Sequence, residues 1–216
     1  MIIRSGIGGG LIVGVDLDNT VVSYDSLFHR VATERGLING NVRTSKREVR
    51  DALWELPDGD IHWQKLQGLV YGPRMGDATL IDGVKEFFQL CKQRKVPVYI
   101  ISHKTKYAPY DGTKTNLREA SLAWIRSQGL LEKKITGLTQ SAVCFEPSRR
   151  RKIQRIARLG CTHFIDDLEE TFLEDYFPGN VEKILFSPNP QDASPTGATV
   201  LNSWEDIKGY FFGANS

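Results

Sequence analysis

Pairs of carboxylate side chains occur at two places in this 216-residue chain where an apolar segment gives way to polar residues. Asp16 and Asp18 follow the apolar residues of segment 11–15, and Asp166 and Asp167 end another short apolar segment. Carboxylates at the end of a buried strand are destabilised by desolvation unless a cation neutralises them. Hard divalent cations prefer oxygen ligands of this kind. The two pairs therefore predict a metal site if the fold brings them together.

A hydroxyl and a basic run accompany the carboxylates. Ser102 follows the apolar residues 96–101, and Lys152 ends the basic run 149–152, fourteen residues before Asp166. Each feature alone also fits an ordinary structural role, because carboxylates and serine cap helices and a basic run often lies on a solvated helix face. The conjunction of the four groups in this order favours one shared site.

The elements that must position these groups alternate along the chain. Short apolar runs predict strands, at residues 11–15, 96–101, 142–145, 163–165 and 183–186. Stretches with helical spacing lie between or after them, at residues 83–94, 116–128, 148–159, 169–176 and 203–212. This alternation predicts an α/β fold, a Rossmann-like parallel sheet flanked by helices. Ligands bind such sheets beyond the carboxyl ends of the strands, where the polar groups above are expected.

A mostly helical segment interrupts the alternation after the first strand. Residues 21–81 show no convincing strand and contain three helical patterns, at residues 25–36, 45–56 and 60–69. We therefore expect a core domain of residues 1–20 and 82–216 and a helical cap subdomain of residues 21–81. The alternative is that the segment merely provides crossover helices. Arg74 is a candidate contact for an anionic substrate, and four aromatic or imidazole side chains either line a pocket or pack the insert: Trp54, His62, Trp63 and Tyr71.

The amino-acid composition limits the kinds of partner that we expect for this chain. The 28 Lys and Arg against 26 Asp and Glu give a formal charge of +2, which gives no overall electrostatic reason to expect nucleic acid or a membrane surface as a partner. No apolar run approaches the roughly 20 residues that span a bilayer. The three cysteines show no CxxC spacing, so we expect a reducing, cytoplasmic location.

With these motifs the sequence resembles the haloacid dehalogenase (HAD) superfamily of phosphatases and phosphotransferases. Its first motif, DxDxT after an apolar strand, is matched by residues 16–20, and its second, a strand ending in Ser or Thr, by Ser102. The third, a lysine at a helix start, is best matched by Lys152, with the arginines at 149–151 as alternatives. The fourth, a strand ending in an acidic pair, is matched by residues 164–167. The resemblance covers most of the chain and implies a HAD-like core with a small helical cap inserted after the first strand.

The resemblance implies roles for the acidic residues. Asp16 would attack phosphorus and form an aspartyl-phosphate. Asp18 would protonate the leaving oxygen and then activate water. Mg²⁺ would be held by Asp16, by the main-chain carbonyl of Asp18, by Asp167 and, directly or through water, by Asp166. Asp18 also favours phosphoryl transfer, because the dehalogenases of the family lack an acid at that position.

The resemblance implies a phosphate site as well. Ser102 and Lys152 would hold the phosphoryl oxygens, and Lys152 would stabilise charge in the transition state. We also count Asn19, Thr20 and His103 among the phosphate- or substrate-binding residues, although His103 is explained equally well as part of a solvated turn.

The expected function is that of an Mg²⁺-dependent phosphatase acting on a small phosphorylated metabolite. Three alternatives stay within phosphoryl chemistry: a nucleotidase, a polynucleotide phosphatase and a mutase. A different class is a phosphoacceptor signalling domain without turnover, although the order of the acidic motifs is not that of a receiver domain. The sequence leaves the substrate and the oligomeric state open.

Overall fold

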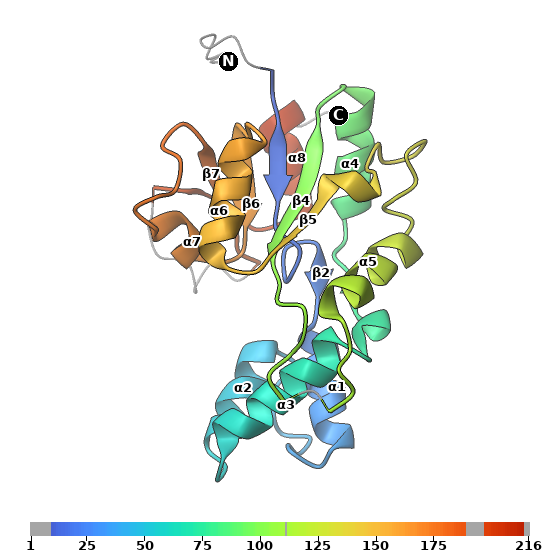
Figure 1. Cartoon of the computed structure of the whole chain (residues 1–216), viewed down its shortest axis with the longest axis vertical. Coiled ribbons are helices and arrows are strands. Elements are labelled where there is room, and N and C mark those ends of the chain that lie inside the picture. Colours follow the sequence, from blue (N-terminus) through green and yellow to red (C-terminus); the bar gives the residue numbers. More distant parts are fainter. Residues whose placement is uncertain (1–9, 111, 189–196, 214–216) are drawn as a thin grey trace.

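A parallel β-sheet with helices on both faces makes up the larger part of the structure (Figure 1). The structure is a computed structural model that describes residues 10–110, 112–188 and 197–213. Its strands are β1 (Val13–Val15), β2 (Val22–Ser23), β3 (Thr79–Leu80), β4 (Val98–His103), β5 (Val143–Glu146), β6 (His163–Asp166), β7 (Glu182–Phe186) and β8 (Thr199–Leu201). Its α-helices are α1 (Asp25–Glu34), α2 (Lys46–Trp54), α3 (Gly59–Tyr71), α4 (Val84–Gln93), α5 (Leu117–Ser127), α6 (Arg149–Arg158), α7 (Glu169–Leu173) and α8 (Trp204–Phe212). Two 3₁₀ turns, η1 (Met75–Asp77) and η2 (Gln140–Ala142), complete the elements of the described residues.

The strand order places the carboxylate pairs side by side. The sheet runs β5-β4-β1-β6-β7-β8, with parallel pairing throughout. Val15 at the end of β1 is in register with Ile100 of β4 and Ile165 of β6. The residues that follow these positions therefore leave the sheet at one edge, as expected for a parallel sheet.

The strands are apolar because both faces of the sheet are covered. Ile165 and its in-register partners face a core shared with α4, α5 and α8, whereas Phe164 faces a second core formed with α6 and α7. Gly14 of β1 makes room for Phe164, because a Cβ at Gly14 would lie 2.6 Å from its ring. Full burial of each large apolar side chain stabilises the fold by about 1.5–3 kcal/mol.

Helices α1, α2 and α3 form a lobe beyond the carboxyl ends of the strands, which we call the helical lobe (Figure 1). The chain enters the lobe after β2 and returns through β3, and these two strands pair antiparallel with Val22 opposite Leu80. Inside the lobe, Phe28 of α1 stacks on Trp63 of α3 at a ring distance of 4.9 Å. The helical lobe lies within the 21–81 segment, for which the subdomain boundaries remain a prediction.

The predicted α/β class and parallel sheet are confirmed, and all five predicted strands are present. The helix predicted over 148–159 forms as α6, with Ser148 accepting a hydrogen bond from the Arg151 amide at 3.3 Å as its N-cap. The expectation that residues 21–81 hold no strand was wrong, since β2 and β3 lie there; at two residues each they are too short for a periodicity to reveal. Strand β8 was not predicted, and the helix predicted over 169–176 ends at Leu173 because Glu174 adopts an extended conformation.

Candidate active site

A buried lysine joins two carboxylates at the carboxyl edge of the sheet. The Nζ atom of Lys152, near the start of α6, lies 2.6 Å from Oδ1 of Asp16 and 2.7 Å from Oδ2 of Asp166. Asp16 is 5% exposed, Lys152 3% and Asp166 0%. The Asp16 amide donates a hydrogen bond to the carbonyl of Ile165, which fixes the end of β1 against β6.

Asp16, Asp166 and Asp167 together form an all-oxygen cluster. One carboxylate oxygen from each lies within 4.8 Å of the others. Burial raises the pKa of Asp167 to about 7, and the neighbouring charge of Asp166 adds to this effect. Burial also raises the pKa of Asp16 well above its ordinary value, despite the opposing effect of Lys152. Within the described residues, no lysine, arginine or histidine nitrogen lies within 4.0 Å of the Asp167 carboxylate. Full ionisation of the three carboxylates would therefore need a cation in addition to Lys152.

A tight turn after β1 supports this cluster. The Leu17 carbonyl accepts hydrogen bonds from the amides of Val21 and Val22 at 2.9 and 3.0 Å, and Asn19 adopts a φ of 58° in the left-handed region, which asparagine tolerates better than most residues. The turn brings Thr20 to Asp167, where the Thr20 hydroxyl accepts a hydrogen bond from the Asp167 amide at 3.1 Å and donates one to its carboxylate at 3.3 Å. In this structure Thr20 therefore positions Asp167. The phosphate-binding role that the sequence predicts for Thr20 stays a prediction.

Asp18 is held separately from the cluster. Its carboxylate accepts a hydrogen bond from the Tyr24 hydroxyl at 2.6 Å and lies 2.9 Å from Nζ of Lys104. Burial by itself raises the pKa of Asp18, but the Lys104 ammonium and the Tyr24 hydrogen bond outweigh it and lower the pKa. Burial and the Asp18 charge in turn raise the pKa of Tyr24 well above its ordinary value.

A cavity of about 470 Å³ opens beside these groups, between the sheet edge and the helical lobe. Its lining includes every predicted site residue except the buried Thr20 and Asp166, namely Asp16, Asp18, Asn19, Ser102, His103, Lys152 and Asp167. The helical lobe contributes Lys46, Gln64, Gln67 and Tyr71. Burial, with the charge of Lys152, lowers the pKa of His103, so this imidazole is mostly neutral at pH 7. A cavity of this size suits a small molecule.

Several candidates from the sequence lie away from the cavity. Arg74 forms ion pairs with Glu34 at 2.6 Å and Asp77 at 2.8 Å and does not line the cavity. Arg149, an alternative to Lys152, pairs with Glu174 at 3.0 Å. Of the four aromatic or imidazole side chains of the insert, only Tyr71 lines the cavity; Trp63 packs inside the lobe, and Trp54 is 52% exposed beneath the Arg50 guanidinium.

Four residues of the cavity region were not predicted from the sequence as contributors to the site: Tyr24, Lys46, Gln64 and Gln67. Lys104 was noted only as a neighbour of His103. The pairing of Lys104 with Asp18 has a weak signal in the sequence, because Lys104 follows Ser102 by two residues at the end of a strand. The position of Lys46 has no signal in the sequence, because it depends on how the helical lobe lies against the sheet.

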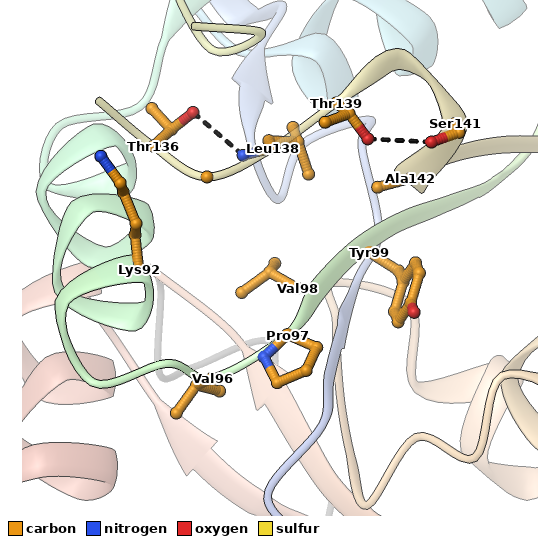
Figure 2. Close-up of a pocket in the computed structure, with 11 residues that line it drawn as sticks. Lys92, Val96, Pro97, Val98, Tyr99, Thr136, Leu138, Thr139, Ser141 and Ala142 are labelled. Atoms are coloured by element: carbon orange, nitrogen blue, oxygen red, sulfur yellow. Dashed lines mark hydrogen bonds between the residues drawn. The ribbon is translucent and has the colours of Figure 1, made fainter. Parts of the chain in front are cut away.

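A second cavity of about 260 Å³ lies at the other end of β4, between α4 and residues 136–142 (Figure 2). Its threonine and serine hydroxyls are already used, since Thr136 accepts a hydrogen bond from the Leu138 amide at 3.2 Å and Thr139 bonds Ser141 at 2.9 Å (Figure 2). No carboxylate lines it. This second cavity therefore lacks the carboxylate groups that lie at the carboxyl edge of the sheet.

Comparison with solved structures identifies the fold. The chain is similar to a HAD-family hydrolase from Deinococcus radiodurans whose structure holds bound phosphate and sodium (18% identity, TM-score 0.58, 94% of this chain and 95% of that chain). It is also similar to a HAD-superfamily hydrolase from Ehrlichia chaffeensis (14%, 0.52, 95% and 97%) and to a protein described as a dehalogenase (12%, 0.51, 95% and 98%). No family model matches the chain, and no curated protein matches it in sequence. The chain therefore has the fold of the HAD-superfamily hydrolases, as the motifs predicted.

Among the described residues, no helix combines the length and the apolar character that crossing a bilayer requires.

Proposed function

We propose that this chain is a metal-dependent phosphatase that hydrolyses small phosphorylated metabolites. One observation carries the proposal: carboxylates from the ends of β1 and β6 meet around Lys152 beside a cavity that Ser102 also lines. The bound phosphate in the similar Deinococcus radiodurans structure supports a phosphorylated substrate. The dehalogenase among the similar structures gives no such support for a haloacid substrate. Asp18 supplies the acid that phosphoryl transfer needs once an anionic substrate binds beside it, because that charge raises the pKa that Lys104 and Tyr24 lower.

The carboxylate cluster fits Mg²⁺. It offers only oxygen donors, and the Asp167 carboxylate has no cationic partner within 4.0 Å among the described side chains. Asp16 and Asp167 would hold the ion together with the main-chain carbonyl of Asp18, and Asp166 would assist them. When bound, the ion supplies charge neutralisation between an anionic nucleophile and an anionic phosphate.

The residues of the chain divide the chemistry into two displacements. The Asp16 carboxylate attacks phosphorus, the bond from phosphorus to the leaving oxygen breaks, and Asp18 gives that oxygen a proton. Water then attacks the aspartyl-phosphate, Asp18 takes up the proton from the water, and the bond to Asp16 breaks. Lys152 and Ser102 hold the phosphoryl oxygens in both steps, with Asn19 and His103 at the edge of the same site.

The surroundings of the site fit this reaction. We assign the helical lobe the role of a cap that covers the substrate and limits access of water. A cavity of about 470 Å³ favours a compact substrate over a polynucleotide. Three free cysteines agree with a reducing, cytoplasmic compartment.

A phosphatase assay tests the proposal. Purified protein is assayed with p-nitrophenyl phosphate, sugar phosphates, phosphorylated acids and a haloacid, in Mg²⁺ and in EDTA. We expect phosphate release in Mg²⁺ only, and a loss of at least about 1,000-fold in kcat for Asp16→Asn. Asp175→Asn, which neutralises an exposed carboxylate, is the matched control. Full activity of Asp16→Asn, or turnover of the haloacid alone, would refute the proposal.

A further inference from the structure

Lys46 places a cation from the helical lobe in the wall of the active-site cavity. It is the first residue of α2, and its amide donates a hydrogen bond to the Asp25 carboxylate at 2.8 Å, which fixes the start of that helix. Its Nζ atom lies over two aromatic rings, 5.8 Å from the centre of Phe28 and 5.7 Å from that of Tyr71. Cation–π contacts of this kind hold an ammonium in place without neutralising its charge.

The other lysines of the cavity are already paired. Lys152 is bonded to Asp16 and Asp166, and Lys104 to Asp18. Among the described residues, no carboxylate oxygen lies within 4.0 Å of the side-chain nitrogen of Lys46. Lys46 is thus the lysine of the cavity wall whose charge is left for a ligand.

The charge of Lys46 persists at neutral pH. Burial acts to lower its pKa, but the facing Tyr71 side chain and the carboxylates of Asp167 and Asp18 raise it overall. His103, on the sheet side of the same cavity, is mostly neutral at pH 7 because its pKa is lowered.

Lys46 shares the cavity wall with two polar side chains of the helical lobe. Gln64 and Gln67 of α3 line the cavity with it. The Gln64 amide nitrogen already donates a hydrogen bond to Asp60, and the Gln67 amide adds donor and acceptor groups suited to carboxylate or hydroxyl oxygens. These groups belong to the helical lobe, whereas the predicted phosphate ligands belong to the sheet edge. A phosphoester bound between the two would present its leaving group to Lys46.

We propose that Lys46 is the anion-binding residue of a leaving-group subsite, so that the substrate is a small phosphomonoester whose leaving group carries a second negative charge, a carboxylate or another phosphate. This inference rests on the proposed phosphatase function and adds the class of substrate. Lys46 acts on binding and selectivity and takes no part in bond breaking.

Two substrates that differ at one carbon test the proposal. 3-Phosphoglycerate and glycerol 3-phosphate share the phosphoester and the neighbouring hydroxyl, and the first has a carboxylate where the second has a hydroxymethyl group. We expect the wild-type kcat/KM to favour 3-phosphoglycerate, and Lys46→Met to reduce this preference about 10- to 100-fold, the usual effect of losing a charge-assisted hydrogen bond. Glycerol 1,3-bisphosphate, which has a second phosphate in place of the carboxylate, is assayed in parallel and shows whether Lys46 selects a phosphate in the same way.

The controls separate the subsite from general electrostatics. Lys65→Met removes the same charge from an exposed position of α3 outside the cavity, and it should keep the wild-type preference. Lys46→Arg should keep part of it. If Lys46→Met lowers kcat/KM equally for both esters, Lys46 only balances the carboxylates of the site, and the subsite is refuted.

A binding measurement keeps the inference independent of turnover. In the Asp16→Asn background with Mg²⁺, the shift in melting temperature is compared for the two esters, with and without Lys46→Met. A larger shift with 3-phosphoglycerate that disappears with Lys46→Met supports the subsite even if no phosphatase activity is found. Equal shifts in the two backgrounds would overturn it while leaving the p-nitrophenyl phosphate assay to decide the proposed function.

Discussion

Nζ of Lys104 lies 2.9 Å from the carboxylate of Asp18, and this ion pair is almost fully shielded on the lysine side, where the side chain is 3% exposed. The same ammonium lies 5.0 Å from the centre of the Tyr71 ring. Lys104 therefore connects the proposed acid–base residue at the sheet edge to helix α3 of the helical lobe.

The first prediction concerns the positioning role of Lys104. In Lys104→Met the Asp18 carboxylate keeps only the Tyr24 hydrogen bond, so we expect its orientation to loosen and kcat to fall about 10- to 100-fold, with a smaller change in KM. Steady-state kinetics with p-nitrophenyl phosphate measures both constants. Lys104→Arg, which keeps a cation, should restore part of kcat.

Lys106→Met is the matched control for this prediction. Lys106 lies on the following loop, over the ring of the exposed Tyr107, and does not line the cavity. A fall in kcat for Lys106→Met as large as that for Lys104→Met would show that the effect comes from net charge instead of the contact with Asp18.

The second prediction contrasts two substitutions in one buried ion cluster. Lys152→Met leaves Asp16 and Asp166 without their shared cation, and removal of one partner of a buried pair costs about 3–5 kcal/mol. Asp16→Asn leaves the Lys152–Asp166 pair intact and relieves repulsion among carboxylates, so we expect a change in unfolding free energy of less than about 1 kcal/mol. Urea unfolding at pH 7 measures both, and equal losses would contradict the shared-cation arrangement.

The third prediction concerns the carboxylate cluster as a cation site. Mg²⁺ that binds only the folded chain stabilises it and so raises its melting temperature. The stabilisation is about 2.7 kcal/mol when the Mg²⁺ concentration is 100 times the dissociation constant. Asp167→Asn removes one proposed ligand while keeping the shape of the side chain, so a higher Mg²⁺ concentration should be needed for the same shift. Asp175→Asn, at an exposed position, should respond as the wild type does. An unchanged Mg²⁺ dependence in Asp167→Asn would exclude this residue as a ligand.

The outline of the site was predictable because it depends on strand ends. Asp16 and Asp166 each follow a buried apolar run, and parallel strands bring such ends to one edge whatever the order of strands in the sheet. The 14-residue spacing that singled out Lys152 also agrees with the contact between Lys152 and Asp166.

The rest was not predictable because it depends on packing between elements. The contact of Tyr24 with Asp18 requires the tight turn after β1, and the position of Lys46 requires the placement of the helical lobe over the sheet edge. Strand β8 has only three residues and is largely exposed, so it is too short for a periodicity to reveal it. These features belong to tertiary structure and leave little trace in local periodicity.

The fourth prediction concerns the buried thiols. Burial raises the pKa of Cys91 and that of Cys161 to about 12, whereas Cys144 is partly buried and its pKa is raised less. At pH 8 the folded protein should therefore react slowly with a thiol reagent, mainly at Cys144, and all three cysteines should react in denaturant.

The same two thiols should make stability depend on alkaline pH. In the unfolded chain they ionise near pH 8.5, but in the folded chain they stay protonated up to about pH 12, so their contribution to the unfolding free energy is complete below about pH 8 and is lost as the pH rises toward 12. At pH 10 the contribution of each thiol to the unfolding free energy should be smaller by about 1–2 kcal/mol than at neutral pH. The measurement is the difference in unfolding free energy between pH 7.5 and pH 10, for the wild type and for a Cys91→Ala, Cys161→Ala double variant. Comparison of the two proteins cancels the titration of all other groups. An equal fall in unfolding free energy in both would show that these thiols are not protected from ionisation in the folded state.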